Sequence, residues 1–339
     1  MQTEKENAMK PTSRVNVVLI AFVIAVLFSG ADRCANAASK TYPDKARSVN
    51  YIVPYPPGGG TEVSSRIVAA MLAKELGIPV EIVLKPGAGG QVGVTVLSQS
   101  KPDGYTIGPM VFPTVITTSN DPDRKAVFSR KSFELLGMHM IDPGIIAVKG
   151  DSPYKTLKDL LDAAKAKPGS IKTTTSGIGS DDHIAALKTE QASGVKFAIV
   201  HFDGATPGRT AVLGGHVEAY YGNASEVIGQ AKGGEMRVLA VMDEKRSPFY
   251  PDVKTAKEQG YPIFSGVQHG AAVPAGTPRE TRDVLEAAYK KGITSAEFKE
   301  RMAKMALQPI FMDAREFSDF WAKYEADIVK WIDVCKQPR

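Results

Sequence analysis

Cysteine is scarce in this chain, with only Cys34 and Cys335 among 339 residues. Cys34 falls in an N-terminal targeting segment, so Cys335 alone remains after export, which excludes an intrachain disulfide and a cysteine-based metal site. The five histidines show no metal-ligand spacing. Dense basic runs interleaved with aromatics are also missing, so the net charge of +5 does not indicate nucleic acid. We therefore expect no metal, no cofactor and no nucleic-acid partner.

An apolar run long enough to span a membrane is lacking as well. The N-terminal run, residues 15–28, is shorter than the roughly 20 residues of a spanning helix, which argues against a membrane anchor. Lys10 and Arg14 precede it, and the small residues 35–37 follow in an A-x-A pattern. This arrangement predicts a signal peptide over residues 1–37, cleaved near Ala37, and a periplasmic location. Met9 is also a more natural start than Met1.

The composition is that of a globular protein, because 43% of the residues are hydrophobic and 23% are charged. The length favours two domains.

A glycine-rich loop near the start of the mature chain organises the first half. Residues 49–53 are typical of a strand, residues 54–60 contain three prolines and three glycines, and a helical pattern follows, with Thr61 as the expected N-cap. Glycines before a helix start leave amide groups and the positive end of the helix dipole facing one place, which predicts an anion site. No Lys-Ser/Thr follows, so the loop is not a nucleotide P-loop. The alternative is a turn without a ligand.

The second loop of this type, residues 86–90, follows the expected strand 80–84. Val92 stands where a dinucleotide fingerprint requires its third glycine, so we reject that interpretation. A turn at Asp103-Gly104 then leads into another strand. Alternation of strands and helices predicts a parallel sheet with right-handed crossovers.

The same alternation continues after an apolar stretch, residues 135–148, that we expect to cross from one domain to the other. Expected strands end at loops rich in Gly, Ser, Thr or Asn. These strands and loops are 171–175 before 176–180, 195–201 before 202–208, and 217–221 before 222–225. With the two earlier loops, this makes five such junctions. Because ligands bind outside the carboxyl ends of strands in open α/β sheets, the pattern predicts a cleft between two facing sheets.

The C-terminal part is predicted to hold three helices after residue 278. In the last one, apolar and mainly aromatic residues recur at helical spacing, which indicates a core face packed on the first domain rather than a binding site. They are Phe317, Phe320, Trp321, Tyr324, Ile328, Trp331 and Ile332.

Side chains that could carry chemistry are few. Ser180 and His183, with two aspartates between them, raise the alternative of a secreted serine hydrolase. No G-x-S-x-G turn is present, and neighbours on a helix point in different directions, so we expect Ser180 to be an N-cap and both residues to contact a ligand. Asp203 either binds a cationic or hydroxyl group of the ligand or is a solvated loop residue. Arg66 and Arg209 are expected to be solvated.

The chain resembles the periplasmic substrate-binding proteins of tripartite tricarboxylate transporters, the Bug family, over nearly the whole mature sequence. The resemblance rests on motifs in the same order: residues 52–61, 86–90, 101–106, Gly179-Ser180 with His183, 213–215, 246–248, 251–253 and 258–261. It implies an α/β, two-domain, type II-like Venus-flytrap fold of a non-enzymatic, monomeric receptor. A small carboxylate would lie in the interdomain cleft and pass to integral-membrane transporter subunits. A non-transporting periplasmic sensor subunit is the alternative.

The resemblance also implies domain boundaries and ligand contacts. We expect domain 1 to comprise residues 38–140 and 269–339, and domain 2 to comprise residues 141–268. The family's ligand loops correspond to Tyr55, Pro57, Gly59, Thr61, Gly89, Gly90, Ser176, Ser180 and His183, and the junction loops add Gly177, Asp203, Gly204 and Asn223.

The sequence departs from the family pattern at several positions. The family usually has Asp where Glu62 and Glu218 stand, Asn-Arg at residues 84–85, and Lys-Gly at residues 203–204. Because Asp203 lies on a ligand-facing loop, its change bears on which acid is bound and not on the fold.

Overall fold

One long strand, β4 (Phe133–Lys149), joins two lobes of the molecule. The computed structural model describes residues 42–337, and the residues from Lys45 onward form one compact unit. The signal peptide predicted over residues 1–37 lies outside the described residues.

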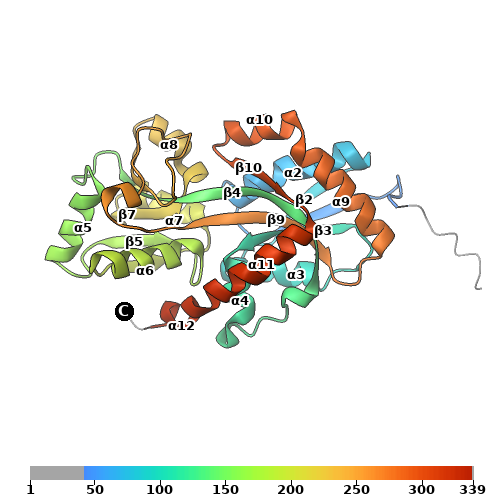
Figure 1. Ribbon diagram of the computed structural model, residues 1–339, viewed down its shortest axis with the longest axis horizontal. Helices are drawn as coiled ribbons and strands as arrows, with labels where there is room; N and C mark the ends of the chain where they lie inside the picture. The colour runs from blue at the N-terminus through green and yellow to red at the C-terminus, as the bar shows by residue number, and fades with distance from the viewer. Residues whose placement is uncertain (1–41, 338–339) are drawn as a thin grey trace, which may run out of the picture. The chain divides into compact units, whose positions relative to one another are not determined.

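The first lobe is built on parallel strands flanked by helices, as predicted. Strand β1 pairs in parallel with β2 and β3, and β3 pairs antiparallel with β9. The strands are β1 (Val49–Val53), β2 (Val80–Leu84), β3 (Thr106–Phe112), β9 (Gly266–Pro274) and β10 (Gln308–Met312). The helices are α2 (Gly60–Leu76), α3 (Gln91–Ser98), α4 (Thr114–Asn120), α9 (Arg279–Thr294), α10 (Ala296–Lys304), α11 (Ala314–Ile328) and α12 (Ile332–Cys335) (Figure 1).

The second lobe repeats the strand-to-helix alternation. Strand β5 pairs in parallel with β6 and β7, and β7 and β8 pair antiparallel with β4. The strands are β5 (Lys172–Thr175), β6 (Ala198–His201), β7 (Ala219–Asn223) and β8 (Met236–Val241). The helices are α5 (Leu157–Ala166), α6 (Asp181–Ser193), α7 (Ala205–Leu213) and α8 (Ile228–Lys232). Short 3₁₀ turns cover residues 88–90, 122–124, 130–132, 224–227, 257–259 and 329–331.

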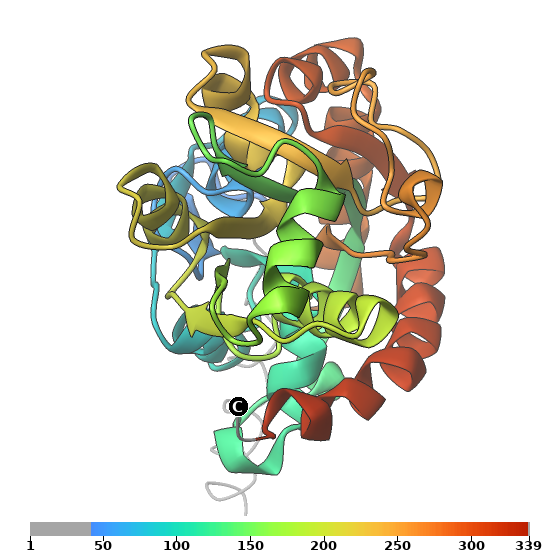
Figure 2. The same cartoon turned by 90° about the vertical axis from the view of Figure 1, so that its left-hand side faces the viewer.

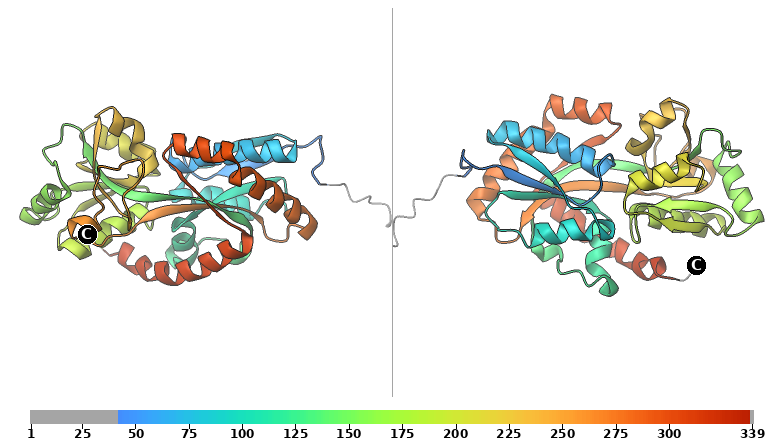
Figure 3. Two further views of the ribbon diagram at one scale, coloured as in Figure 1. Left: turned by 45° about the horizontal axis from the view of Figure 1, so that its top comes forward. Right: turned by 180° about the vertical axis from the view of Figure 1, so that it is seen from behind.

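The described strands form one mixed sheet of ten strands rather than the two separate sheets we expected. Residues 133–143 of β4 pair with β9, whereas residues from Gly144 onward pair with β7 (Figures 1 and 3). The chains are so close at this change of partner that a Cβ on Gly266 would lie 2.6 Å from the Asp142 carbonyl oxygen. Glycine there lets β4 and β9 cross between the lobes side by side.

Both faces of the second-lobe sheet are covered by helices, as Figure 2 shows from that end. Side chains of β4 alternate between the faces, because successive residues of a strand point in opposite directions. Ile146 and Val148 pack with α5 and α6, while Ile145 and Ala147 pack with α7 and the segment 224–227. This second-lobe core fixes the positions of the strand ends that carry the loops.

The aromatic stripe of α11 is confirmed as a core face of the first lobe. Phe317 and Trp321 are fully buried, and the Trp321 ring centroid lies 4.8 Å from that of Phe112 on β3. No helix within residues 42–337 has the length and hydrophobicity required to cross a bilayer.

Candidate functional site

Loops from both lobes enclose a small cleft beside the crossing strands. Its free volume is about 40 Å³. The residues that line it come from the loop before α2 and the first turn of that helix, the end of β3, the start of α4, strand β9, the end of β7, and the turns and helix starts that follow β5, β6 and β7. They are Tyr55, Pro56, Gly59, Gly60, Thr61, Val111, Thr114, Ser176, Asp181, Gly204, Ala205, Thr206, Asn223, Glu226, Val267 and His269.

Hydrogen bonds across the cleft hold the lobes together. The Gly89 amide donates to Asp203 Oδ1 at 3.0 Å, and the Thr206 hydroxyl donates to the Pro57 carbonyl at 3.2 Å. Thr117 on α4 donates to the Gly179 carbonyl at 2.8 Å. Pockets for small molecules usually enclose about 300 Å³ or more, so this is a closed arrangement that must open to admit a ligand.

Two helices begin at the cleft without a side-chain cap. The N-cap residues are Gly59 for α2 and Gly204 for α7, and neither offers a side chain to the first-turn amides. The first turns of both helices therefore direct amide groups and positive dipole ends into one space. The N-cap role predicted for Thr61 is wrong, because α2 begins at Gly60, two residues earlier than that role requires, and its N-cap is Gly59. Thr61 lies in its first turn, with its hydroxyl 3.3 Å from His269 Nε2.

The second glycine loop supports the cleft from behind and does not line it. Gly90 has φ +96°, and a Cβ on it would lie 3.0 Å from the Tyr55 ring. The Tyr55 hydroxyl donates to the Gly89 carbonyl at 3.4 Å. Glycine here leaves room for the ring of Tyr55, a cleft-lining residue, to pack closely against the loop. Asp203 is engaged by the Gly89 amide and is not among the lining residues.

The third glycine loop places one predicted residue in the cleft and caps α6. Ser176 lines the cleft and donates its hydroxyl to Asp182 Oδ2 at 2.6 Å. Ser180 is confirmed as the N-cap of α6, since its Oγ accepts the His183 amide at 3.2 Å. The His183 Nδ1 accepts the Gly179 amide at 3.2 Å, so this ring nitrogen does not serve Ser180 as a base.

His183 lies away from the cleft, against His201, with 4.6 Å between ring centroids. Of the predicted ligand contacts, the structure brings six together in the cleft and leaves seven outside its lining. The six are Tyr55, Gly59, Thr61, Ser176, Gly204 and Asn223; the seven are Pro57, Gly89, Gly90, Gly177, Ser180, His183 and Asp203.

Buried carboxyl groups around the cleft are the feature that sequence reasoning missed. Burial raises the pKa of Asp142 and Asp182, and burial together with the charge of Glu226 raises the pKa of Asp181 to about 7. Burial also raises the pKa of Glu226, although amide hydrogen bonds from Asn223 and Gly60 oppose the shift. The positions of two of these acids in the sequence could have indicated them. Asp181 directly follows a glycine loop, and Glu226 closes a capping box with Asn223.

The cleft contains no basic side chain to balance these acids. None of its lining residues within the described chain is Lys or Arg. Burial lowers the pKa of His269 to about 3, so its ring is neutral. Arg209 is the nearby cation, and its guanidinium donates to the Glu226 and Gly58 backbone carbonyls at the rim. Acidic groups and neutral donors therefore define the chemistry of this space.

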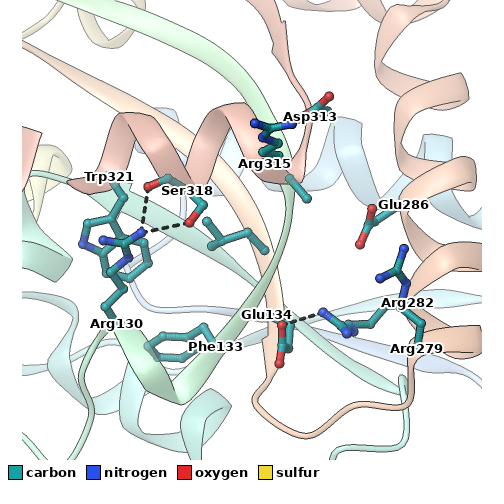
Figure 4. A pocket seen from close by; sticks show the side chains of 12 residues that line it. Arg130, Phe133, Glu134, Arg279, Arg282, Glu286, Asp313, Arg315, Ser318 and Trp321 are labelled. Carbon is teal, nitrogen blue, oxygen red and sulfur yellow. Dashed lines mark hydrogen bonds and ion pairs between the residues drawn. The ribbon is translucent and has the colours of Figure 1, made fainter. Parts of the chain in front are cut away.

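A larger hollow of about 440 Å³ lies on the first lobe between α9 and α11 (Figure 4). Three of its four arginines have protein partners: Arg282 pairs with Glu134 at 2.5 Å, Arg279 pairs with Asp283 at 2.8 Å, and Arg130 donates to the Ser318 hydroxyl at 2.9 Å. None of the glycine loops reaches it. We therefore take the smaller cleft between the lobes, which the glycine loops border, as the candidate functional site.

Comparison with known proteins gives a consistent picture. Residues 64–334 match the sequence model of the family described as "Tripartite tricarboxylate transporter family receptor". BugT of Bordetella pertussis is 28% identical over 334 residues, covering 95% of this chain and 98% of BugT.

Solved structures agree with that match. The periplasmic binding protein BugD is 29% identical with a TM-score of 0.77, covering 87% of this chain and 98% of BugD. MatC from Rhodopseudomonas palustris with bound malate has the same fold at 24% identity, with a TM-score of 0.77 over 86% of this chain and 100% of MatC.

Proposed function

Because this chain belongs to the tripartite tricarboxylate transporter receptor family, we propose that it binds a small organic carboxylate between its lobes, in the periplasm, and delivers it to membrane transporter subunits. The observation that carries the proposal is the convergence of two uncapped helix starts, at Gly59 and Gly204, on one closed cleft. A carboxylate placed there would accept backbone hydrogen bonds, each worth about 1.5–3 kcal/mol to a charged group.

Opening and closing of the lobes would admit and trap the ligand. The free volume of about 40 Å³ does not hold a carboxylic acid together with its contacts. Strands β4 and β9 cross between the lobes and are the segments that would bend, as in other hinged binding proteins. The bonds from Gly89 to Asp203 and from Thr206 to Pro57 would break on opening and reform on closing.

The predicted site residues divide into two roles under this proposal. Those that line the cleft would touch the ligand, and those outside the lining would shape the loops that present them. MatC, which carries malate on the same fold, supports a dicarboxylate-sized ligand as a starting point. The lobes would act as one monomeric receptor with domain boundaries near residues 140 and 268.

Calorimetry with a panel of mono-, di- and tricarboxylic acids tests the proposal, and Gly59→Ala locates the site. A Cβ on Gly59 would meet nothing within 4 Å, and its φ of −91° suits alanine, so the fold should tolerate the change. The methyl group would occupy space that the ligand requires, so we expect affinity to fall about tenfold or more.

Gly229→Ala is the matched control, since a Cβ there also meets nothing within 4 Å and Gly229 lies outside the cleft. Its affinity should equal that of the unaltered protein. Absence of binding by every acid in the panel would refute the proposed function. Purification of a membrane partner with the ligand-loaded protein distinguishes a transporter subunit from a sensor.

A further inference from the structure

Two side-chain oxygens of the cleft lining, Asp181 Oδ2 and Asn223 Oδ1, lack a hydrogen-bond partner within residues 42–337. Asp181 is 5% exposed and lines the cleft, and its Oδ2 has no partner within residues 42–337. A buried acceptor left unsatisfied costs about 1–3 kcal/mol, so a binding site with such an atom is suited to a ligand that brings a donor.

The side chains of Asn223 and Asp182 interact with the Asp181 carboxyl group, but no neighbour is hydrogen-bonded to its Oδ2. Glu226 also lines the cleft, and its Oε2 already accepts the Asn223 amide at 2.8 Å and the Tyr220 hydroxyl at 2.7 Å. The Ser176 hydroxyl is committed to Asp182. Two carboxyl groups thus face a space whose lining contains no Lys or Arg among the described residues.

The cleft therefore has two poles. Amide groups at the starts of α2 and α7 form a pole that attracts a carboxylate. Asp181 and Glu226 form a pole that attracts a donor with positive charge, and the two poles adjoin where Glu226 accepts the Gly60 amide at the start of α2. No group of three His, Cys, Asp or Glu side chains within residues 42–337 is arranged for a metal ion, which favours an organic cation at the second pole.

We propose that the ligand is a zwitterion, a small carboxylic acid that also carries an ammonium group, with its carboxylate at the helix starts and its ammonium at Asp181 and Glu226. The inference rests on the proposed function and specifies its ligand class. An ammonium group supplies the missing donor to Asp181 Oδ2, and its charge favours the ionised form of two buried carboxyl groups in a cleft that no Lys or Arg of the described residues lines. A hydroxyl group would supply the donor but not the charge.

Calorimetry with matched pairs of ligands tests the inference. The pairs are aspartate against succinate, glutamate against glutarate, and β-alanine against propionate, with malate as the hydroxyl analogue. Charge-assisted hydrogen bonds to a buried carboxylate should make the amino members bind about 10- to 100-fold more tightly than their partners. Equal or tighter binding of the des-amino acids would overturn the inference and leave the proposed function intact. Binding of none of these acids would overturn both.

The variants Asp181→Asn and Glu226→Gln test the assignment of the ammonium pole. The readout is the affinity ratio within each pair, which a general loss of folding or closure would not change. We expect each variant to reduce the ratio by about tenfold, because it should weaken binding of the ligand that carries the amino group. Asp162→Asn, which alters an exposed residue of α5 paired with Lys158, is the control and should preserve the ratio. An unchanged ratio in both cleft variants would overturn the assignment.

Discussion

Gly90 shows how a single residue sets the shape of the cleft. Its φ of +96° belongs to the left-handed region that L side chains rarely adopt, and it lies against the ring of Tyr55. We expect Gly90→Ala to lower the free energy of unfolding by about 1–2 kcal/mol through backbone strain. The added methyl group should also push the Tyr55 ring into the cleft and weaken carboxylate binding. Chemical denaturation and calorimetry measure the two effects.

Gly169→Ala separates strain from the displacement of Tyr55. Gly169 has φ +74°, and a Cβ there would meet nothing within 4 Å, so this variant should lose stability and keep its affinity. If both variants bind equally well, Gly90 does not act through the aromatic ring.

Asp181 should make the free energy of unfolding decrease as the pH rises, whereas an acid paired with a cation at the surface makes it increase. Its pKa rises from 3.8 to about 7 in the folded protein, so the folded state retains a proton that the unfolded state releases between these values. Stability contributed by this group is present below about pH 4 and is lost as the pH rises to about 7. Asp142, Asp182 and Glu226 surround it and also have raised pKa values.

Denaturation of the unaltered protein and Asp181→Asn at pH 5, 6, 7 and 8 tests this sign. The variant should gain stability relative to the unaltered protein as the pH rises from 5 to about 7, by on the order of 1 kcal/mol per pH unit, and the difference should level off by pH 8. Asp162→Asn removes an exposed carboxylate and should show a nearly constant difference. A difference that is constant for Asp181→Asn would mean that this carboxyl group ionises normally in the folded protein.

At the scale of elements, local patterns predicted most of the strands and helices. The strands 49–53 and 80–84 lie where their β-branched residues indicated, and Ser180 caps α6 as predicted. These features depend on neighbours in the sequence. Strand β10 was missed, because its five half-buried residues between two helices become a strand only by pairing with β4.

The site was predicted only in part, because some of its features follow from the local sequence and others depend on how the lobes pack. Glycine loops at strand ends identify a cleft, because their positions follow from the order of elements. Which loop residues line the cleft depends on the closure of the lobes, and so does the meeting of Asp181 from α6 with the start of α2. The resemblance to the receptor family is confirmed, and the two-domain α/β fold with it.

At the scale of the whole molecule, the C-terminal helices connect the lobes by a second route besides β4 and β9. The buried cluster around Trp321 on α11 extends to Ile184 and Leu187 on α6 of the second lobe (Figures 1 and 3). Trp331 lies in this connection, with the Lys188 Nζ 5.8 Å from its ring centroid. A contact between lobes that forms in the closed state stabilises that state relative to the open one.

Trp331→Ala should therefore favour opening. The closed state would become a smaller fraction of the population. Because the apparent affinity for a carboxylate is proportional to this fraction, we expect it to fall about 3- to 10-fold. Small-angle scattering of the ligand-free variant should give a larger radius of gyration. Phe320→Ala is the control, because the ring contacts of Phe320 are with Phe112 on β3 and with Tyr324 on α11, not with α6. It should lower stability by a similar amount without changing affinity or size. If Trp331→Ala left the carboxylate affinity and the radius of gyration unchanged, closure would depend on the cleft loops and not on this C-terminal connection.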